Sequence, residues 1–407
     1  MEGMDPVVSW EHLSAVELTV LDRLFWSESM SRGELASLAD FSRSKANTAV
    51  ASLIERGLLE ERGAQPSSGG RRPGTLCLSN AVGVLVGVDI GATSVDVALL
   101  APDMTVLAHH AEAADVRNGP TQLLSRVRKV ISELLALNQM ENDQVLAIGV
   151  GVPGPVAFDS GLLDHPPLMP GWERFSIRDC LGEDHSAPVF VDNDVNLMAL
   201  GALWHLRRRL QNFLVVKIGT GIGCGIVCHG AVYRGNNGSA GDVGHICVDL
   251  GGPRCHCGNV GCVEAMAAGP AIARMADEAA RKGESPLLSE MLATKGELTP
   301  YDVGAASSAG DAAANAIIKR AGNHIGQMLA AVVNFYNPSH VFIGGGIAAT
   351  GPLFLASIRQ SVYHRSLALS TRHLEIQYVP NAQKAGIIGA GVLGVQEILL
   401  RARARES

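Results

Sequence analysis

Apolar side chains recur at helical spacing in three segments of the first 80 residues. Each segment follows a serine that can cap a helix, and the first two serines precede a glutamate by three positions, as in a capping box. The three capping residues are Ser14, Ser31 and Ser42. Gly57 follows the third segment and is suited to end it. Two short apolar stretches, 58–60 and 76–78, then predict a hairpin.

The third predicted helix has one apolar face and one polar face. The polar face carries Arg43, Ser44, Lys45, Asn47 and Thr48. These side chains can bond to the phosphates and base edges of DNA. Short helices followed by a hairpin are typical of a winged helix-turn-helix, in which Arg71 and Arg72 at the hairpin tip reach an adjacent minor groove. A three-helix bundle with a solvated basic loop is the alternative, but the basic residues concentrate on the helix face and the tip, which favours DNA binding.

From residue 83 onward, apolar strands alternate with glycine-rich turns. Strand–turn–strand patterns occupy 83–100 and 215–227, and a third glycine turn at 341–347 precedes a helix. Backbone N–H groups in such turns can approach a phosphate, although a buried hairpin has much the same look. The candidate phosphate-binding residues are Asp89, Gly91, Thr93, Gly219, Thr220, Gly221, Gly344 and Gly345. The repetition predicts a duplicated, actin-like α/β fold that closes on a nucleotide and a substrate.

A polar cluster follows the predicted strand that begins at Val189. Asp192, Asn193 and Asp194 lie where this strand ends, just before a helix predicted at 197–206. Groups at the carboxyl end of a strand are well placed to bind a polar ligand, and an amide beside a carboxylate can bond two sugar hydroxyls. A helix cap explains one of the three residues but does not need all of them.

Four potential metal ligands also lie close together in the sequence. His245 precedes Cys255, Cys257 and Cys262. Zn²⁺ prefers four nitrogen or sulfur ligands in a tetrahedron, and a structural site takes all four from the protein. Glycines between the second and third cysteines allow the chain to fold back sharply. Small buried hydrophobes are the alternative role for these cysteines, but so tight a cluster favours zinc.

Composition narrows the class of protein further. The 407 residues are 47% hydrophobic and 18% charged with a net charge of −7, so any basic surface must be local. The eight cysteines occur without a secretion signal, which indicates reduced thiols, metal binding and a cytoplasmic compartment. We expect no membrane insertion, because no apolar run reaches about 18 residues.

Together these motifs resemble the ROK family (repressors, open reading frames and sugar kinases) over nearly the whole chain, in its branch with an N-terminal winged helix. The most specific motif is Cys-x-Cys-Gly-x-x-Gly-Cys-x-Glu, which is complete at 255–264. The resemblance implies that His245 and the three cysteines bind a structural zinc ion. It also implies a sugar site lined by Asn193, Asp194, Asp242, His245 and Glu264. In kinases of the family, the residue matching Asp194 is the general base of an ATP- and Mg²⁺-dependent phosphoryl transfer.

The expected fold class is therefore α/β, with an N-terminal winged helix-turn-helix and a two-lobed actin-like domain that carries a structural zinc site. The expected domains are 1–80 for DNA binding, 81–199 with 381–407 for the first lobe, and 200–380 for the second. We expect the second lobe to carry both the zinc site and the dimerisation surface.

Two positions depart from the kinase pattern of the family. Ala92 stands where the first phosphate turn has a second glycine, and a Cβ there can obstruct a phosphate. Asp242 replaces a glutamate that is one methylene longer. The first change weakens the case for ATP, while neither change removes the sugar site.

We therefore expect a sugar-responsive DNA-binding regulator of carbohydrate metabolism genes, acting as a repressor. It would bind operator DNA and, in the cleft between the lobes, a sugar or sugar phosphate effector, as a homodimer or homotetramer. The alternative is an ATP-dependent sugar kinase of the glucokinase type, alone or combined with DNA binding, with Asp194 as base. A third interpretation is an interaction protein that docks a transporter or signalling subunit.

Overall fold

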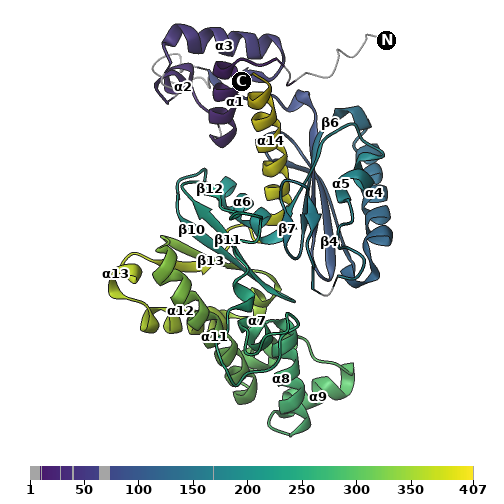
Figure 1. The fold of residues 1–407 in the computed structure, drawn as a ribbon, viewed down its shortest axis with the longest axis vertical. Helices are drawn as coiled ribbons and strands as arrows, with labels where there is room; N and C mark the ends of the chain where they lie inside the picture. Colours follow the sequence, from purple (N-terminus) through teal and green to yellow (C-terminus); the bar gives the residue numbers. More distant parts are fainter. Residues whose placement is uncertain are drawn as a thin grey trace. The chain divides into compact units, whose positions relative to one another are not determined.

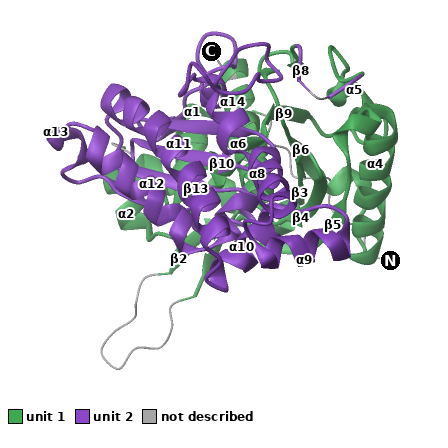
Figure 2. Ribbon diagram, turned by 90° about the horizontal axis from the view of Figure 1, so that it is seen from below, with its two compact units in different colours: residues 1–164, 171–209, 386–407 green, residues 165–170, 210–385 purple. Residues whose placement is uncertain are grey.

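The computed structural model describes residues 10, 12–27, 29–38, 41–63, 74–167 and 169–406, whose helices and strands are drawn in Figure 1. The chain divides into two compact units, coloured separately in Figure 2. Unit 1 contains Met1–Asp164, Gly171–Arg209 and Gly386–Ser407. Unit 2 contains His165–Pro170 and Leu210–Ala385.

Unit 1 begins with three helices and a two-stranded antiparallel sheet. These are α1 (Ala15–Trp26), α2 (Arg32–Leu38), α3 (Arg43–Glu55), β1 (Leu59–Arg62) and β2 (Thr75–Leu78). The predicted caps at Ser14, Ser31 and Ser42 are confirmed, because each hydroxyl accepts a hydrogen bond from the backbone N–H three residues along. Gly57 follows α3 with a φ of 71°, as expected of a residue that ends a helix. Residues 39–40 and the predicted hairpin tip at 64–73 lie outside the described residues.

The rest of unit 1 is built on a five-stranded sheet with the order β5-β4-β3-β6-β9. Its strands are β3 (Val84–Ile90), β4 (Ser94–Leu100), β5 (Val106–Ala113), β6 (Val145–Val152) and β9 (Val189–Asn193). The accompanying helices are α4 (Pro120–Leu137), α5 (Ile177–Gly182), α6 (Asp194–His205) and α14 (Ala385–Glu406). Short elements are β7 (Val156–Ala157), β8 (Leu162–Leu163), η1 (Asn80–Val82), η2 (Val116–Asn118) and η3 (Asn142–Gln144). Every residue of β6 is buried, which is typical of a parallel strand with both faces covered.

The C-terminal helix α14 returns to the sheet of unit 1. It lies so close to β6 that a Cβ on Gly149 would overlap the carbonyl oxygen of Ala390. Among the described residues it is the one helix long and apolar enough to cross a membrane by length and composition, with 61% of that window buried. Its packing on the sheet accounts for this apolar character, because core helices have the same composition.

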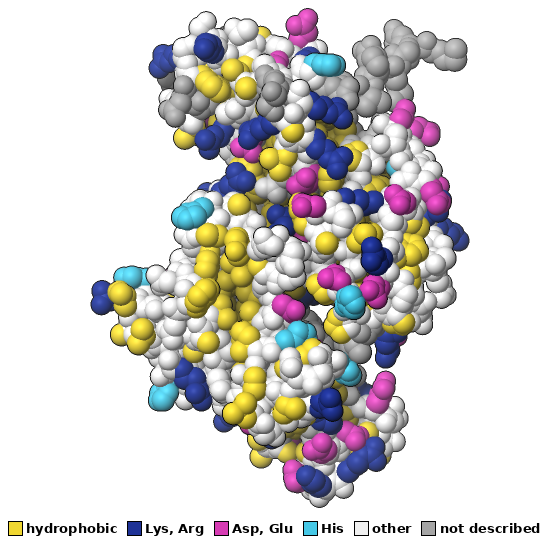
Figure 3. All heavy atoms as spheres, viewed as in Figure 1, with side chains coloured by type: hydrophobic (Ala, Val, Ile, Leu, Met, Phe, Trp, Pro, Cys, Tyr) yellow, Lys and Arg dark blue, Asp and Glu magenta, His cyan; other side chains and the backbone are white. Residues whose placement is uncertain are grey.

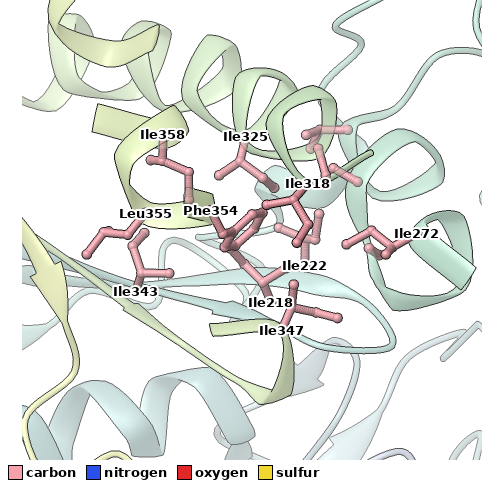
Figure 4. Packing of buried hydrophobic residues seen from close by; sticks show 14 of the residues in the cluster. Ile218, Ile222, Ile272, Ile318, Ile325, Ile343, Ile347, Phe354, Leu355 and Ile358 are labelled. Carbon is pink, nitrogen blue, oxygen red and sulfur yellow. The ribbon is translucent and has the colours of Figure 1, made fainter. Parts of the chain in front are cut away.

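Unit 2 contains the second five-stranded sheet, with the order β12-β11-β10-β13-β14. Its strands are β10 (Phe213–Ile218), β11 (Ile222–Cys228), β12 (Ala231–Val232), β13 (His340–Gly344) and β14 (Glu375–Tyr378). Its helices are α7 (Val263–Ala267), α8 (Gly269–Arg281), α9 (Pro286–Lys295), α10 (Pro300–Ser308), α11 (Ala312–Tyr336), α12 (Pro352–Arg365) and α13 (Ala368–Thr371), with η4 (Val243–His245) and η5 (Gly346–Thr350). Figure 4 shows the core, in which Phe354 and Ile358 of α12 and Ile325 of α11 pack over Ile343 of β13.

The two sheets share one topology. In each, an antiparallel hairpin (β3–β4 or β10–β11) is extended by two parallel strands on the side of its first strand. A further antiparallel strand (β5 or β12) extends the other side. The duplicated α/β fold predicted from the repeated glycine turns is therefore confirmed.

One helix boundary was predicted wrongly. The helix expected at 197–206 begins at Asp194, directly after Asn193 of β9. The reason is that Asn193 itself caps the helix, its side-chain Oδ1 accepting the backbone N–H of Val195 at 2.9 Å. As a result, Asp194 is the first residue of α6.

A charged cluster on the edge strand β5 was not predicted from the sequence. His110 Nε2 lies 2.8 Å from Glu112 Oε2, and Arg126 of α4 reaches the same carboxylate at 2.7 Å. The Arg126 guanidinium and His110 hold the pKa of Glu112 at about 2. The cluster ties α4 to the sheet edge.

Candidate functional site

The four predicted metal ligands lie together in unit 2. The ligand atoms of His245, Cys255, Cys257 and Cys262 all lie within 4.8 Å of one another. His245 is the last residue of η4, and Cys262 directly precedes α7. Glycine at position 261 is required between them, because φ is 72° and a Cβ would overlap the carbonyl oxygen of Asp249.

The distances within this cluster match a zinc tetrahedron. Zinc–sulfur bonds of about 2.3 Å give an S···S edge of about 3.8 Å, and a zinc–nitrogen bond of about 2.0 Å gives an S···N edge of about 3.5 Å. The Sγ atoms of Cys257 and Cys262 are 3.7 Å apart, and Cys255 Sγ is 3.6 Å from His245 Nδ1. Burial raises the pKa of the Cys262 thiol to about 12, so a cation is needed to favour its thiolate at neutral pH. The donor set and its spacing fit a structural zinc ion.

His245 presents its second ring nitrogen away from the cysteines. Its Nδ1 faces Cys255, whereas its Nε2 lies 3.8 Å from Oδ1 of Asp242. The Asp242 side chain is 57% exposed. Asp242 therefore lies beside His245, and its carboxylate is accessible to a polar ligand.

Glu264 connects the cysteine cluster to a glycine turn of unit 2. Its Oε2 accepts the backbone N–H of Ile222 at 3.0 Å, and a Cβ on Gly221 would come within 2.7 Å of the same oxygen. Gly345 lies against the end of β10, where a Cβ would overlap the carbonyl oxygen of Ile218. Hence two glycine turns of unit 2, at 219–221 and at Gly344–Gly345, both lie beside the end of β10. Glu264 contacts the first of these turns. The link from Glu264 to Ile222 was not predicted from the sequence.

In unit 1, the predicted polar cluster follows β9. The Asn193 amide is engaged at both ends, since Oδ1 caps α6 and Nδ2 donates to the carbonyl of Gly154 at 2.8 Å. Asp192 is buried and accepts from the Asn193 backbone at 2.7 Å and from Asn196 Nδ2 at 2.9 Å. Asp192 therefore fixes the start of α6, a role that the sequence reasoning did not assign.

Asp89 and Asp194 border the same glycine of β6. A Cβ on Gly151 would lie 3.4 Å from Asp89 Oδ1 and 3.4 Å from the Cα of Asp194. The structure thus brings Asp89, near the end of β3, close to Asp194, the first residue of α6. Gly91 is partly buried and Thr93 is exposed in the turn that follows β3.

The polar residues predicted on the third helix form one exposed face of α3. Arg43, Ser44, Lys45, Asn47 and Thr48 are all exposed, while Ala46, Ala49, Val50 and Leu53 of the same helix are buried. Figure 3 shows Lys and Arg side chains gathered over the N-terminal helices. Arg71 and Arg72 lie outside the part of the chain that is described.

Ser52 of α3 bonds to the first helix. The hydroxyl of Ser52 donates to the buried Glu17 of α1 at 2.6 Å. Glu17 also accepts the backbone N–H of Ser14 at 2.8 Å. The bond from Ser52 joins the third helix to the first, and no signal in the sequence marked it, whereas the bond from Ser14 belongs to the predicted capping box.

The chain belongs to the ROK family, whose sequence model matches residues 85–397. A glucokinase from Halalkalibacterium halodurans is 32% identical over 77% of this chain and 95% of its own. The xylose repressor of Caldicellulosiruptor bescii is 26% identical over 94% of this chain and 96% of its own. The crystal structure of a ROK family transcriptional regulator, described as a homolog of the E. coli MLC protein, superposes with a TM-score of 0.80 at 26% identity, over 96% of this chain and 98% of that one.

Proposed function

We propose that this protein is a sugar-responsive transcriptional repressor of carbohydrate metabolism genes. The observation that carries the proposal is an N-terminal head of three helices and a hairpin joined to a ROK domain. The family model begins at residue 85, and the glucokinase relative matches 77% of the chain, whereas the xylose repressor matches 94%. Phosphorylation of a sugar needs no such head, so the longer match favours regulation of genes.

The head is proposed to be a winged helix-turn-helix that reads operator DNA in the cytoplasm. Helix α3 would enter the major groove with its exposed face, where Arg43 and Lys45 neutralise phosphates and Asn47 can reach a base edge. The bond from Ser52 to Glu17 holds this helix on α1, so its exposed face is presented in a fixed orientation. A homodimer or homotetramer would present two heads to an inverted repeat.

A structural zinc ion is proposed at His245, Cys255, Cys257 and Cys262. Four protein ligands leave no open position for water, so the ion would hold the chain in place and supply no reacting group. It would also fix the tautomer and orientation of His245, leaving Nε2 to face Asp242 and a ligand. The matching S···S and S···N distances support this assignment.

The effector is proposed to be a sugar or a sugar phosphate. The residues proposed to bind it are Asn193, Asp194, Asp242, His245 and Glu264. Their carboxylate, amide and imidazole groups are suited to sugar hydroxyls. The effector must bind one arrangement of the repressor better than another, because only differential affinity shifts a conformational equilibrium.

The proposal is tested with operator DNA selected from a random duplex library by the purified full-length protein. Fluorescence anisotropy then measures operator affinity without sugar and with D-glucose, D-xylose, N-acetylglucosamine or their 6-phosphates. A repressor should bind one family of sequences, and one of these compounds should change the affinity about 5- to 150-fold, the usual range of allosteric coupling. Failure to enrich any sequence would refute the proposal.

Sugar kinase activity is the second candidate, favoured by the Asp89 carboxylate and the backbone of Asp194 beside Gly151 and by the glucokinase relatives. Asp194 would then accept the proton of the attacking sugar hydroxyl, and Mg²⁺-ATP would bind at the glycine turns. ADP release from ATP with the same sugars, compared between the wild type and Asp194→Asn, distinguishes the two. A rate that the substitution abolishes would establish a kinase.

A further inference from the structure

Two helices of unit 1 meet in a cluster of aromatic rings. Phe25 and Trp26 end α1, and Trp204 lies one residue before the end of α6. The ring centroids of Phe25 and Trp204 are 4.5 Å apart, those of Trp26 and Trp204 are 5.7 Å apart, and those of Phe25 and Trp26 are 5.3 Å apart. All three residues are buried. These rings therefore join the first helix of the head directly to a helix of the ROK domain.

Two arginines after α6 close the cluster. The Cζ atom of Arg207 lies 4.2 Å from the Trp204 ring centroid, and that of Arg208 lies 3.8 Å from the Trp26 ring centroid. Both arginines have positive φ values, 49° and 53°, which residues with a Cβ rarely adopt. Cation–π attraction favours this conformation, because it places each guanidinium over a ring. The name aromatic corner is used below for Phe25, Trp26, Trp204, Arg207 and Arg208.

The opposite end of α6 carries residues proposed to bind sugar. Asn193 caps the helix and Asp194 is its first residue, about 15 Å from Trp204 at the helical rise. Apart from His205, every residue of α6 is buried. The helix is also held by α14, since a Cβ on Gly389 would overlap the carbonyl oxygen of Leu197. Helix α6 thus has groups proposed to bind sugar at one end and the aromatic corner at the other.

We propose that the aromatic corner transmits the sugar response to the DNA-binding head, with Trp204 as the positioning residue. This inference rests on the proposed function. A sugar that binds at Asp194 acts on the first turn of α6. Because an α-helix is rigid, a shift of this first turn also moves Trp204 in the last turn. The rings of Trp204, Trp26 and Phe25 carry that movement into α1. Helix α1 in turn holds α3 through the bond from Ser52 to Glu17.

The test replaces Trp204 by alanine, with Trp204→Phe as the conservative variant. Arg209→Ala is the matched control, because Arg209 follows the corner arginines in sequence but is exposed and contacts neither ring. For each full-length protein, calorimetry measures binding of the active sugar, and anisotropy measures operator affinity with and without it. Arg208→Gln keeps the rings and removes one cation, which provides a second variant if Trp204→Ala does not fold.

The sugar-induced change in operator affinity is the quantity that decides the inference. Wild type and Arg209→Ala should show the same change, within the range of about 5- to 150-fold. Trp204→Ala should still bind sugar and operator, but sugar should change its operator affinity by less than about twofold. Arg208→Gln should show a change between those of Trp204→Ala and the wild type. Trp204→Phe should recover part of the wild-type change. A wild-type change in operator affinity in both Trp204→Ala and Arg208→Gln would overturn this inference and leave the proposed function standing. A wild type whose operator affinity no sugar alters would overturn the proposed function, and the inference with it.

Discussion

If the proposed zinc and sugar sites exist, substitution Cys257→Ser should remove the metal and weaken sugar binding at the same time. Serine replaces a thiolate by a hydroxyl, which leaves three zinc donors where the structure has four within 4.8 Å. Cys257 is exposed, whereas Cys255 and Cys262 are buried, so this substitution disturbs the core least.

The expected magnitude follows from the cluster. Structural zinc sites are worth roughly 10–16 kcal/mol, so an equal share for each of four ligands is ~3 kcal/mol, or about 200-fold in zinc affinity. Without the ion, His245 is no longer held through Nδ1. The loss of one oriented hydrogen bond from Nε2 costs ~1 kcal/mol, or about fivefold in sugar affinity.

Two assays measure these effects on the purified full-length protein. Elemental analysis after dialysis against a weak chelator gives the zinc content, and titration calorimetry gives the affinity for the active sugar. Cys247→Ser is the matched control, because Cys247 is exposed in the same segment but lies outside the four-ligand cluster. The reasoning is refuted if Cys257→Ser retains one zinc per chain, or if it loses zinc and keeps both wild-type sugar affinity and the sugar effect on DNA.

Three further outcomes are expected. Gly389→Ala should lower the free energy of unfolding by ~3 kcal/mol in urea titrations, because its Cβ would overlap backbone of α6, whereas Gly182→Ala, with open space around it, should change it by less than ~1 kcal/mol. Glu112 has a pKa of about 2 in the folded protein, against an ordinary value of 4.5. Its ionised form therefore stabilises the fold fully above pH 4.5, and this stabilisation is lost as the pH falls from 4.5 toward 2. In acid titrations of the free energy of unfolding, Glu112→Gln should therefore lose less stability than the wild type between these two pH values. Arg43→Ala combined with Lys45→Ala should reduce the slope of log affinity for operator against log salt concentration by about 2, and an unchanged slope would remove these side chains from the DNA contact.

The elements that the sequence predicted best are those with local signals. Capping serines such as Ser14 act on the backbone three residues away, and glycine turns between apolar strands mark both hairpins. Because such signals need no distant partner, they predicted the head's helices and the duplicated sheets. The cysteine cluster was predictable for the same reason, since its four ligands are near in sequence and zinc chemistry restricts their geometry.

The contacts that were missed join residues far apart in the chain. Nothing near Ser52 reveals that it bonds Glu17, and nothing near Trp204 reveals that its ring meets Phe25. The start of α6 was misplaced because Asp192, Asn193 and Asp194 all suit a cap, and only the packed structure selects Asn193. Glu264 was predicted for the sugar, but its bond to the backbone of Ile222 depends on how two separate loops pack in unit 2.

The central claim is tested most directly by titrating one preparation of the full-length protein onto its selected operator, with and without the active sugar, while ATP consumption is followed in parallel. The account predicts specific operator binding, a change of about 5- to 150-fold in that affinity when the sugar is added, and no sugar-dependent ATP turnover. Sugar-dependent ATP turnover by a protein that binds no operator sequence would contradict it.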